Sequence, residues 1–108
     1  MMFDEAESVF AALGDRSRRA IIELVAANPC SVSDLAKALG ITKTAIGQHI
    51  AVLEACRLIK SEKRGRVRIC MLEQSGFDAM RVWIDQHKSH WEAGLDRLGA
   101  AIDQEPQN

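Results

Sequence analysis

The chain has 108 residues, of which 47% are hydrophobic and 27% charged, and its net charge is −1. These totals predict one soluble globular domain with a modest core and exclude a disordered chain. No apolar run approaches the roughly 18 residues of a membrane span, and the acidic start MMFDEAESVF lacks the features of a secretory signal. The three cysteines, Cys30, Cys56 and Cys70, are far apart, which argues against a disulfide framework and for a reducing, cytoplasmic setting.

The charge is sorted along the chain. Residues 1–36 carry three basic and six acidic side chains, residues 37–68 carry eight and two, and residues 69–108 carry three and seven. A local basic excess of this kind is typical of a surface that binds a polyanion. The alternative is an ordinary solvated face.

The first part of the chain predicts three helices. Residues 4–13 show a short helical pattern, and Asp15 is placed to cap a second helix that ends before the NPC segment. Ser31 begins a third helix, with Asp34 three residues later as in a capping box, and Gly40 closes it.

The middle of the chain predicts a fourth helix and a hairpin. Thr42 caps the helix, which runs to about Cys56 and turns Ile46, Ile50 and Leu53 inward. The segments LIKSE and VRICML then alternate like strands around the tip KRGR, where a glycine permits a tight turn, and they predict a two-stranded ribbon.

A long final helix is expected from Glu73 onward, and residues 105–108 are expected to form a flexible tail. Residues 1–104 are therefore predicted to be a single domain. The predicted fold is mainly α with a small β-hairpin wing, in the order α-α-α-α-β-β-α, which is the order of a winged helix-turn-helix.

This order predicts a DNA-binding surface. The N-terminal half of the fourth helix fits the major groove, where Gln48 can read adenine and Ala45 can touch a thymine methyl. The exposed helix terminus at Ser31 is expected to offer backbone N–H groups to phosphates, and the wing cations to contact the DNA backbone. The alternative for the wing is a hairpin edge made soluble by charge. The predicted DNA-binding residues are Ser31, Thr42, Lys43, Thr44, Ala45, Gln48, His49, Lys63, Arg64, Arg66 and Arg68.

Several motifs resemble those of the ArsR/SmtB-type bacterial transcriptional regulators. They are the phenylalanine-led ALGD, an RR pair, the segment SVSDLA and a recognition helix of the form A-I-x-x-H-I-x-V-L, all within about residues 8–72. The end VWIDQHKSHWEAGLDRL and Cys70 resemble one branch of that family. The resemblance implies a homodimeric winged-helix repressor that pairs through its first and last helices.

The last helix predicts a dimer independently. An apolar stripe runs along it for more than five turns, which is longer than one small core requires, and two tryptophans are better explained by a partner than by solvent. A twofold dimer predicts an inverted-repeat operator on double-stranded DNA. The predicted interface residues are Phe10, Trp83, His87, Trp91, Leu95, Leu98 and Ile102.

The metal sites known from this family are not expected here. Ser31 and Ser33 stand where one family site needs thiolates, and serine hydroxyls are poor ligands for soft metals. A second family site on the last helix would need ligands where Leu98 and Ala101 stand. No cofactor is predicted. A rearranged metal site from Asp85, His87, His90 and Glu92 stays open as an alternative, as does an unknown small effector.

Redox sensing is a further alternative. The helix N-terminus beside Cys30 is expected to lower the pKa of its thiol, whereas Cys56 and Cys70 are expected to be structural. Two positions depart from the family pattern: Gly47 replaces a usual serine, and Arg57 replaces the usual glycine after the fourth helix. No catalytic motif is present, so an enzyme is not expected. A helix-turn-helix used for protein contacts alone is the remaining alternative.

Overall fold

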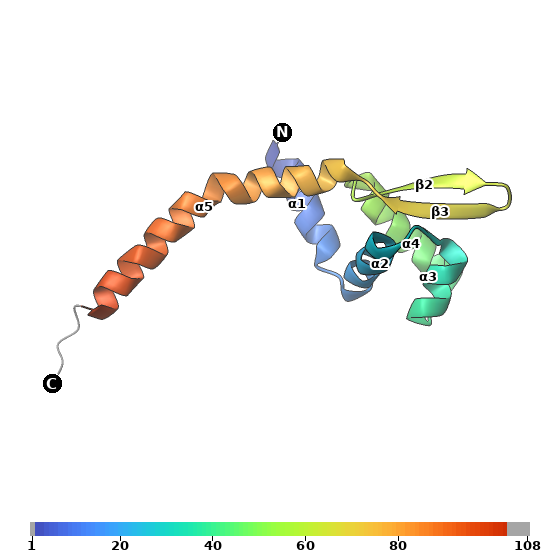
Figure 1. The fold of residues 1–108 in the computed structure, drawn as a ribbon, viewed down its shortest axis with the longest axis horizontal. Helices are drawn as coiled ribbons and strands as arrows, with labels where there is room; N and C mark the ends of the chain where they lie inside the picture. Colours follow the sequence, from blue (N-terminus) through green and yellow to red (C-terminus); the bar gives the residue numbers. More distant parts are fainter. Residues whose placement is uncertain (1, 104–108) are drawn as a thin grey trace.

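The computed structural model of the chain describes residues 2–103, so the predicted tail at residues 105–108 lies outside the described residues. Helix α1 crosses the first half of α5, while α2, α3 and α4 form the body beneath the wing (Figure 1). The wing and the outer half of α5 extend from this body in opposite directions. The elements are α1 (Met2–Leu13), α2 (Arg16–Ala27), β1 (Cys30–Ser31), α3 (Val32–Leu39), α4 (Lys43–Ala55), β2 (Ile59–Arg64), β3 (Val67–Leu72) and α5 (Gln74–Asp103).

The core fills the space between α1, α2, α3, α4 and the sheet. Its buried side chains come from every predicted helical stripe except that of α5, whose Phe77 and Met80 pack against it while partly exposed. The largest fully buried side chains are Ile21, Leu35, Ile46, Leu53, Leu58, Ile59, Val9 and Cys70. The predicted inward face of α4 is confirmed, because Ile46, Ile50 and Leu53 are all buried.

The predicted helix caps are confirmed. The backbone N–H groups of Arg18, Asp34 and Ala45 donate to the side chains of Asp15, Ser31 and Thr42, each at 3.0 Å. These bonds satisfy N–H groups that have no partner within the helix. Gly40 ends α3 with φ +67°, a left-handed conformation that glycine adopts without a steric penalty.

The RR pair has a structural role. The Arg18 Nε donates to the carbonyl oxygen of Ala12 at 2.6 Å, and the Arg19 Nη1 donates to that of Leu13 at 2.7 Å. Both carbonyls lie in the last turn of α1, where no intrahelical donor remains. The two arginines therefore close α1 and fix the angle at which it meets α2.

The sheet has one more strand than the sequence predicted. The two-residue strand β1 pairs antiparallel with β3, so the order is β1-β3-β2 rather than a two-stranded ribbon. Cys30 lies opposite Cys70, and Ser31 lies opposite Ile69. A strand this short carries no alternation of its own, so only its pairing with a distant segment reveals it. It ties the start of α3 to the wing.

The turn after α4 holds an unusual residue. Arg57, in the position where the family pattern has glycine, has φ +60° and therefore adopts the left-handed conformation. The first turn of α5 packs on this turn, and the Gly76 N–H donates to the Arg57 carbonyl at 2.8 Å. A Cβ at Gly76 would stand 2.6 Å from the carbonyl oxygen of Cys56, so only glycine fits there.

Candidate nucleic-acid interface

Helix α4 presents a polar face opposite its buried stripe. Lys43, Thr44 and Gln48 are exposed, and Thr42 precedes them as the N-cap. Ala45 is half-buried, because its position turns it toward the body of the domain. The first turns of α4 therefore offer a cation, hydroxyls and an amide side chain, which are the groups that hydrogen-bond base edges and phosphates.

His49 lies at the edge of this face. It is half-buried and sits close enough to Asp15 that its charge acts on the Asp15 carboxylate. The main cause of the lowered pKa of Asp15 is the hydrogen bond from the Arg18 backbone N–H, and the His49 charge makes a smaller contribution in the same direction. The structure therefore places His49 beside the start of α2, at the margin of the polar face.

Ser31 is not at an exposed helix terminus, contrary to the expectation from the sequence. Its exposed fraction is 8%, and its hydroxyl is occupied as the N-cap of α3. Pairing of β1 with β3 covers it, since Ser31 lies opposite Ile69 in the sheet. Asp34 in the first turn adds a negative charge there, which disfavours a phosphate.

The four wing cations do not share one face. In an antiparallel pair, residues that lie opposite each other point to the same side of the sheet. Lys63 lies opposite Arg68 and shares the side of buried Cys70, while Arg64 lies on the other side. Lys63 and Arg68 line an open hollow of about 450 Å³, together with Ser61 and with Arg66 at the tip of the wing.

Arg68 is held by the recognition helix α4. Its Nη2 lies 3.1 Å from the Glu54 Oε1, and its Nε donates to the Ser61 hydroxyl at 2.8 Å. The same hydroxyl lies 3.4 Å from the Glu54 Oε1, so three side chains from α4, β2 and β3 form one connected group. This group, the Glu54–Ser61–Arg68 cluster, fixes the wing against α4. This cluster could not be predicted from local patterns, because 14 residues separate Glu54 from Arg68.

The remaining wing cations differ in their partners. Arg64 pairs with Glu62 at 3.3 Å on the exposed side of the wing. Within residues 2–103, no ion pair involves Lys63 or Arg66. Of the four predicted wing cations, the two that lack an acidic partner within this range, Lys63 and Arg66, therefore both line the hollow.

The predicted dimer residues divide into two groups. The ring centroids of Phe10 and Trp83 lie 5.1 Å apart, and those of Trp83 and His87 lie 4.1 Å apart. The His87 Nδ1 lies 2.8 Å from the Trp83 carbonyl oxygen. These rings pack on one another within the chain, and Trp91 continues the row with its centroid 5.9 Å from that of His87.

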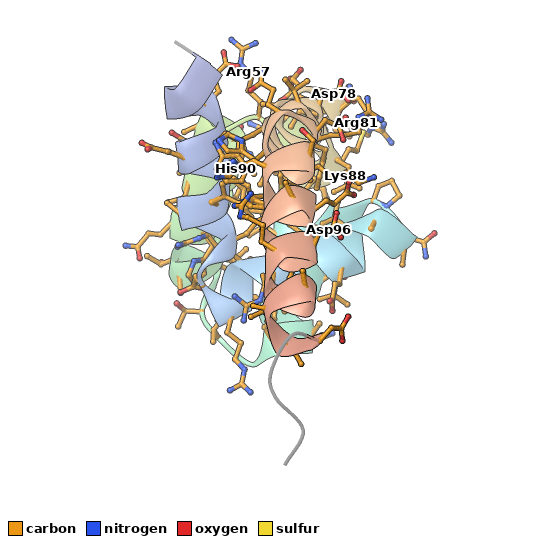
Figure 2. The ribbon with its side chains drawn as sticks, turned by 90° about the vertical axis from the view of Figure 1, so that its left-hand side faces the viewer. Arg57, Asp78, Arg81, Lys88, His90 and Asp96 are labelled. Carbon is orange, nitrogen blue, oxygen red and sulfur yellow. The ribbon has the colours of Figure 1, made fainter. Side chains whose placement is uncertain are left out.

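The outer apolar stripe of α5, which we define as Trp91, Leu95, Leu98 and Ile102, behaves differently. Its exposed fractions are 43%, 65%, 57% and 59%. Charged side chains gather on another edge of the helix, where Figure 2 shows Asp78, Arg81, Lys88 and Asp96 along one side of α5. Three of these belong to two ion pairs on the helix, Arg81–Asp78 at 3.0 Å and Lys88–Glu92 at 3.9 Å. The helix is thus amphipathic beyond the point where α1 covers it.

The rearranged metal site has no geometric support. Within residues 2–103, no three His, Cys, Asp or Glu side chains come together in a way that could hold a metal ion. His87 is stacked against Trp83, and Glu92 pairs with Lys88. The four candidate ligands therefore do not converge.

The cysteine thiols are not activated. Burial is the main cause that raises the pKa of Cys30, and the Asp34 carboxylate raises it further, so the lowering that a helix N-terminus can cause does not prevail there. Burial also raises the pKa of Cys56 and of Cys70.

None of the helices in residues 2–103 is long and apolar enough to cross a membrane.

Comparison with known proteins agrees with this geometry. Residues 15–61 match the family described as bacterial regulatory protein, arsR family. The HTH-type transcriptional regulator Rv2034 of Mycobacterium tuberculosis is 35% identical over 94 residues, which cover 87% of this chain and 85% of the relative. The ArsR-like transcriptional regulator from Rhodococcus sp. RHA1 superposes with a TM-score of 0.73 at 31% identity, over 98% of this chain and 96% of that one.

A crystal structure of a further ArsR family transcriptional regulator gives a TM-score of 0.75 at 34% identity, over 82% of this chain and 92% of that one. These relatives confirm the family resemblance that was inferred from the ALGD, RR and SVSDLA motifs. They also confirm the predicted winged helix-turn-helix fold. They are regulators rather than enzymes. The chain belongs to the arsR family of bacterial regulatory proteins and is a DNA-binding transcriptional regulator.

Proposed function

We propose that the protein is a homodimeric repressor that binds an inverted-repeat operator, with α4 in the major groove and the wing on the backbone. The observation that carries this proposal is the outer apolar stripe of α5, which has more than half of its leucine and isoleucine surface exposed. It supports a twofold dimer, and a twofold dimer of DNA-reading units requires a twofold DNA site.

The length of α5 supports a second chain as its partner. Thirty residues give a helix about 45 Å long, whereas the 12 residues of α1 span about 18 Å. Helix α1 is the main element that packs on α5, so most of the outer half of α5 has no cover from the rest of residues 2–103. The Cα radius of gyration is 19.2 Å, against about 13 Å for a compact domain of this length. An amphipathic helix that extends this far is stabilised by burying its apolar side against a copy of itself.

The exposed polar groups support separate roles in each DNA-reading unit, with base contacts from α4 and phosphate contacts from the start of α4 and the wing. Gln48 can form a bidentate pair with adenine, and Thr44 can contact a base edge or a thymine methyl. Lys43 at the start of α4 and Lys63 and Arg66 on the wing supply cations for phosphates. Two such units related by a twofold axis would read half-sites about 34 Å apart, which is one turn of DNA.

The first experiment measures stoichiometry and site symmetry together. Sedimentation with a labelled duplex from the region upstream of the protein's own gene should show two chains per duplex. Anisotropy titrations should show tighter binding to an inverted repeat than to a single half-site. A monomer in solution that binds a half-site as tightly as the full repeat would overturn the proposal.

The second experiment tests repression and sequence reading. Added protein should reduce transcription in vitro from a promoter that contains the repeat, and increased transcription would contradict repression. Gln48→Ala should narrow the affinity difference between the operator and a scrambled duplex by about 30-fold or more, since the dimer would lose two bidentate base contacts, each worth roughly 1–3 kcal/mol. A Lys37→Ala variant, on α3 outside the predicted contacts, is the matched control.

A further inference from the structure

Cys30 and Cys70 lie directly opposite each other in the sheet. The register of the short strand β1 on β3 pairs them, and neither the spacing of 40 residues nor any local motif reveals this. The Cα atoms of opposite residues in an antiparallel pair lie about 4.5–5.5 Å apart, and a disulfide joins Cα atoms about 4.4–6.8 Å apart. The backbone therefore already holds the two cysteines at a disulfide separation.

Their side chains also share one side of the sheet. The Cys30 Sγ lies 3.1 Å from the Asn28 carbonyl oxygen and 3.7 Å from that of Leu24, so it points toward the end of α2. Cys70 is fully buried in the core on which α2 packs. The proximity of the pair is felt electrostatically, since the pKa of Cys70 is raised mainly by burial, next by Glu54, and to a smaller degree by Cys30.

Cys56 is different. It lies at the end of α4, where its Sγ is 3.5 Å from the Leu53 carbonyl oxygen, and it belongs to no strand pair. All three cysteines are reduced thiols in the structure. Only Cys30 and Cys70 are brought together by the fold, so Cys56 is an internal control.

We propose that Cys30 and Cys70 form a dithiol site that hydroperoxides oxidise to an intramolecular disulfide, which thiols can reduce again. The half-buried Cys30 is the one that peroxide can reach. Its thiolate attacks the peroxide oxygen, which gives a sulfenic acid on Cys30 and releases water, or an alcohol from an organic hydroperoxide. The Cys70 thiol then attacks the sulfenic sulfur, the S–S bond forms, and a second water leaves. The two thiols lose one hydrogen each, and the peroxide takes both electrons.

The disulfide acts as a staple around the DNA-reading unit. The loop that it closes, residues 30–70, contains α3, α4, β2 and most of β3. The strand register already sets the separation of the two Cα atoms within the disulfide range, so we expect the bond to form without a large movement of α4 or the wing. Oxidation therefore raises stability and leaves DNA affinity unchanged. Because burial is the main cause that raises the pKa of both thiols, little thiolate is present at neutral pH, and the oxidation rate increases with pH above 7.

The test uses the full chain with Cys56→Ser, so that only the proposed pair remains, and hydrogen peroxide as the probe. Mass spectrometry of the non-reduced protein should show the loss of two hydrogens per chain, and peptide mapping should link Cys30 to Cys70. The melting temperature should rise by about 10 °C at fixed protein concentration and return on reduction. Affinity for the operator duplex should stay within about twofold.

The control is Cys30→Ser with Cys56 and Cys70 kept, which should show no mass loss and no change in melting temperature. A disulfide that involves Cys56 or joins two chains would overturn the proposal. So would a Cys30 that proceeds to sulfinic acid while Cys70 stays a thiol. A more than tenfold loss of DNA affinity on oxidation would overturn the staple, because it would show that the bond moves α4 or the wing.

Discussion

Residues 30–72 and the outer half of α5 differ in how far contacts within one chain satisfy their polar groups and cover their apolar side chains. In residues 30–72, the caps at Ser31 and Thr42, the pairing of β1 with β3 and the Glu54–Ser61–Arg68 cluster satisfy the backbone and fix the wing. In the outer half of α5, the apolar stripe remains exposed. Residues 30–72 are therefore held together by contacts within one chain, whereas the outer apolar stripe of α5 is left for the partner chain in the proposed dimer. Changes in the first region should act at any protein concentration, and changes in the second should act through assembly.

The largest effect is expected from Leu98→Asp. A carboxylate in the centre of the outer apolar stripe would be buried without a partner in a dimer, so the protein should sediment as a monomer. Operator affinity should fall by roughly 100-fold or more, because one half-site must then bind alone. Ser89→Asp adds the same charge elsewhere on α5 and should leave assembly intact. A dimeric Leu98→Asp protein would show that the stripe is not the interface.

The wing should respond according to the side on which each cation lies. The double change Lys63→Ala and Arg66→Ala should weaken binding to all duplexes by about tenfold or more. It should reduce the slope of log affinity against log salt by about 4, because each of the two wings in the proposed dimer loses two cations. Arg64→Ala should have a smaller effect, because Arg64 lies on the other side of the strand pair with Glu62 as its partner. Anisotropy titrations over a salt series measure both quantities. A loss of affinity from Arg64→Ala as large as that from the double change would contradict this division.

Glu54→Ala tests whether Glu54 affects DNA binding by positioning the wing or through its own negative charge. Removal of a carboxylate near DNA should strengthen binding if charge alone mattered, but loss of the Glu54–Ser61–Arg68 cluster should free the wing and weaken binding by about threefold. Glu62→Ala removes the same charge without touching α4 and should not weaken binding. If Glu54→Ala binds more tightly than the unchanged protein, the cluster does not position the wing.

Gly47→Ala should stabilise the fold. An added Cβ meets no atom within 4 Å, and alanine favours a helix over glycine by about 1 kcal/mol. Gly40→Ala is the matched control, because its site is equally open but has φ +67°, so it should destabilise the fold. Urea unfolding gives both free energies. DNA affinity of Gly47→Ala should stay within about twofold, and a larger loss would show that the backbone at residue 47 approaches DNA closely.

The smallest effect concerns the cap of α2. The hydrogen bond from the Arg18 N–H is the main cause that lowers the pKa of Asp15 below its usual value of 3.8. Because the pKa of Asp15 is lower in the folded than in the unfolded protein, its ionised carboxylate stabilises the fold at pH values above the unfolded-state pKa. This contribution is lost as the pH falls through the folded-state pKa. Asp15→Asn should therefore be less stable than the unchanged protein at pH 6 but not at pH 2. Urea unfolding at the two pH values checks this, and an equal difference at both would show that the charge is irrelevant.

Features that depend on neighbouring residues could be predicted from the sequence. The caps at Asp15, Ser31 and Thr42 and the inward stripe of α4 depend on spacings of three and four residues, and all are present.

Features that depend on distant segments could not be predicted. Strand β1 exists only through its pairing with β3, and the tie between Glu54 and Arg68 joins two elements across 14 residues. The division of the wing cations between two sides depends on strand register, which four cations in six residues do not reveal. Burial of Ser31 followed from the same unpredicted pairing.

The contact between Gly76 and the end of α4 joins the two regions directly. The Gly76 N–H bonds to the Arg57 carbonyl, and an added Cβ would collide with the backbone there, so no flexible linker separates α4 from α5. In the proposed dimer, the distance between the two recognition helices is then set by rigid geometry rather than by a tether. A small rotation of α5 about its first turn would therefore move α4 with it, because the two helices are in direct contact there. The spacing of half-sites that this protein tolerates would thus depend on one residue that has no side chain.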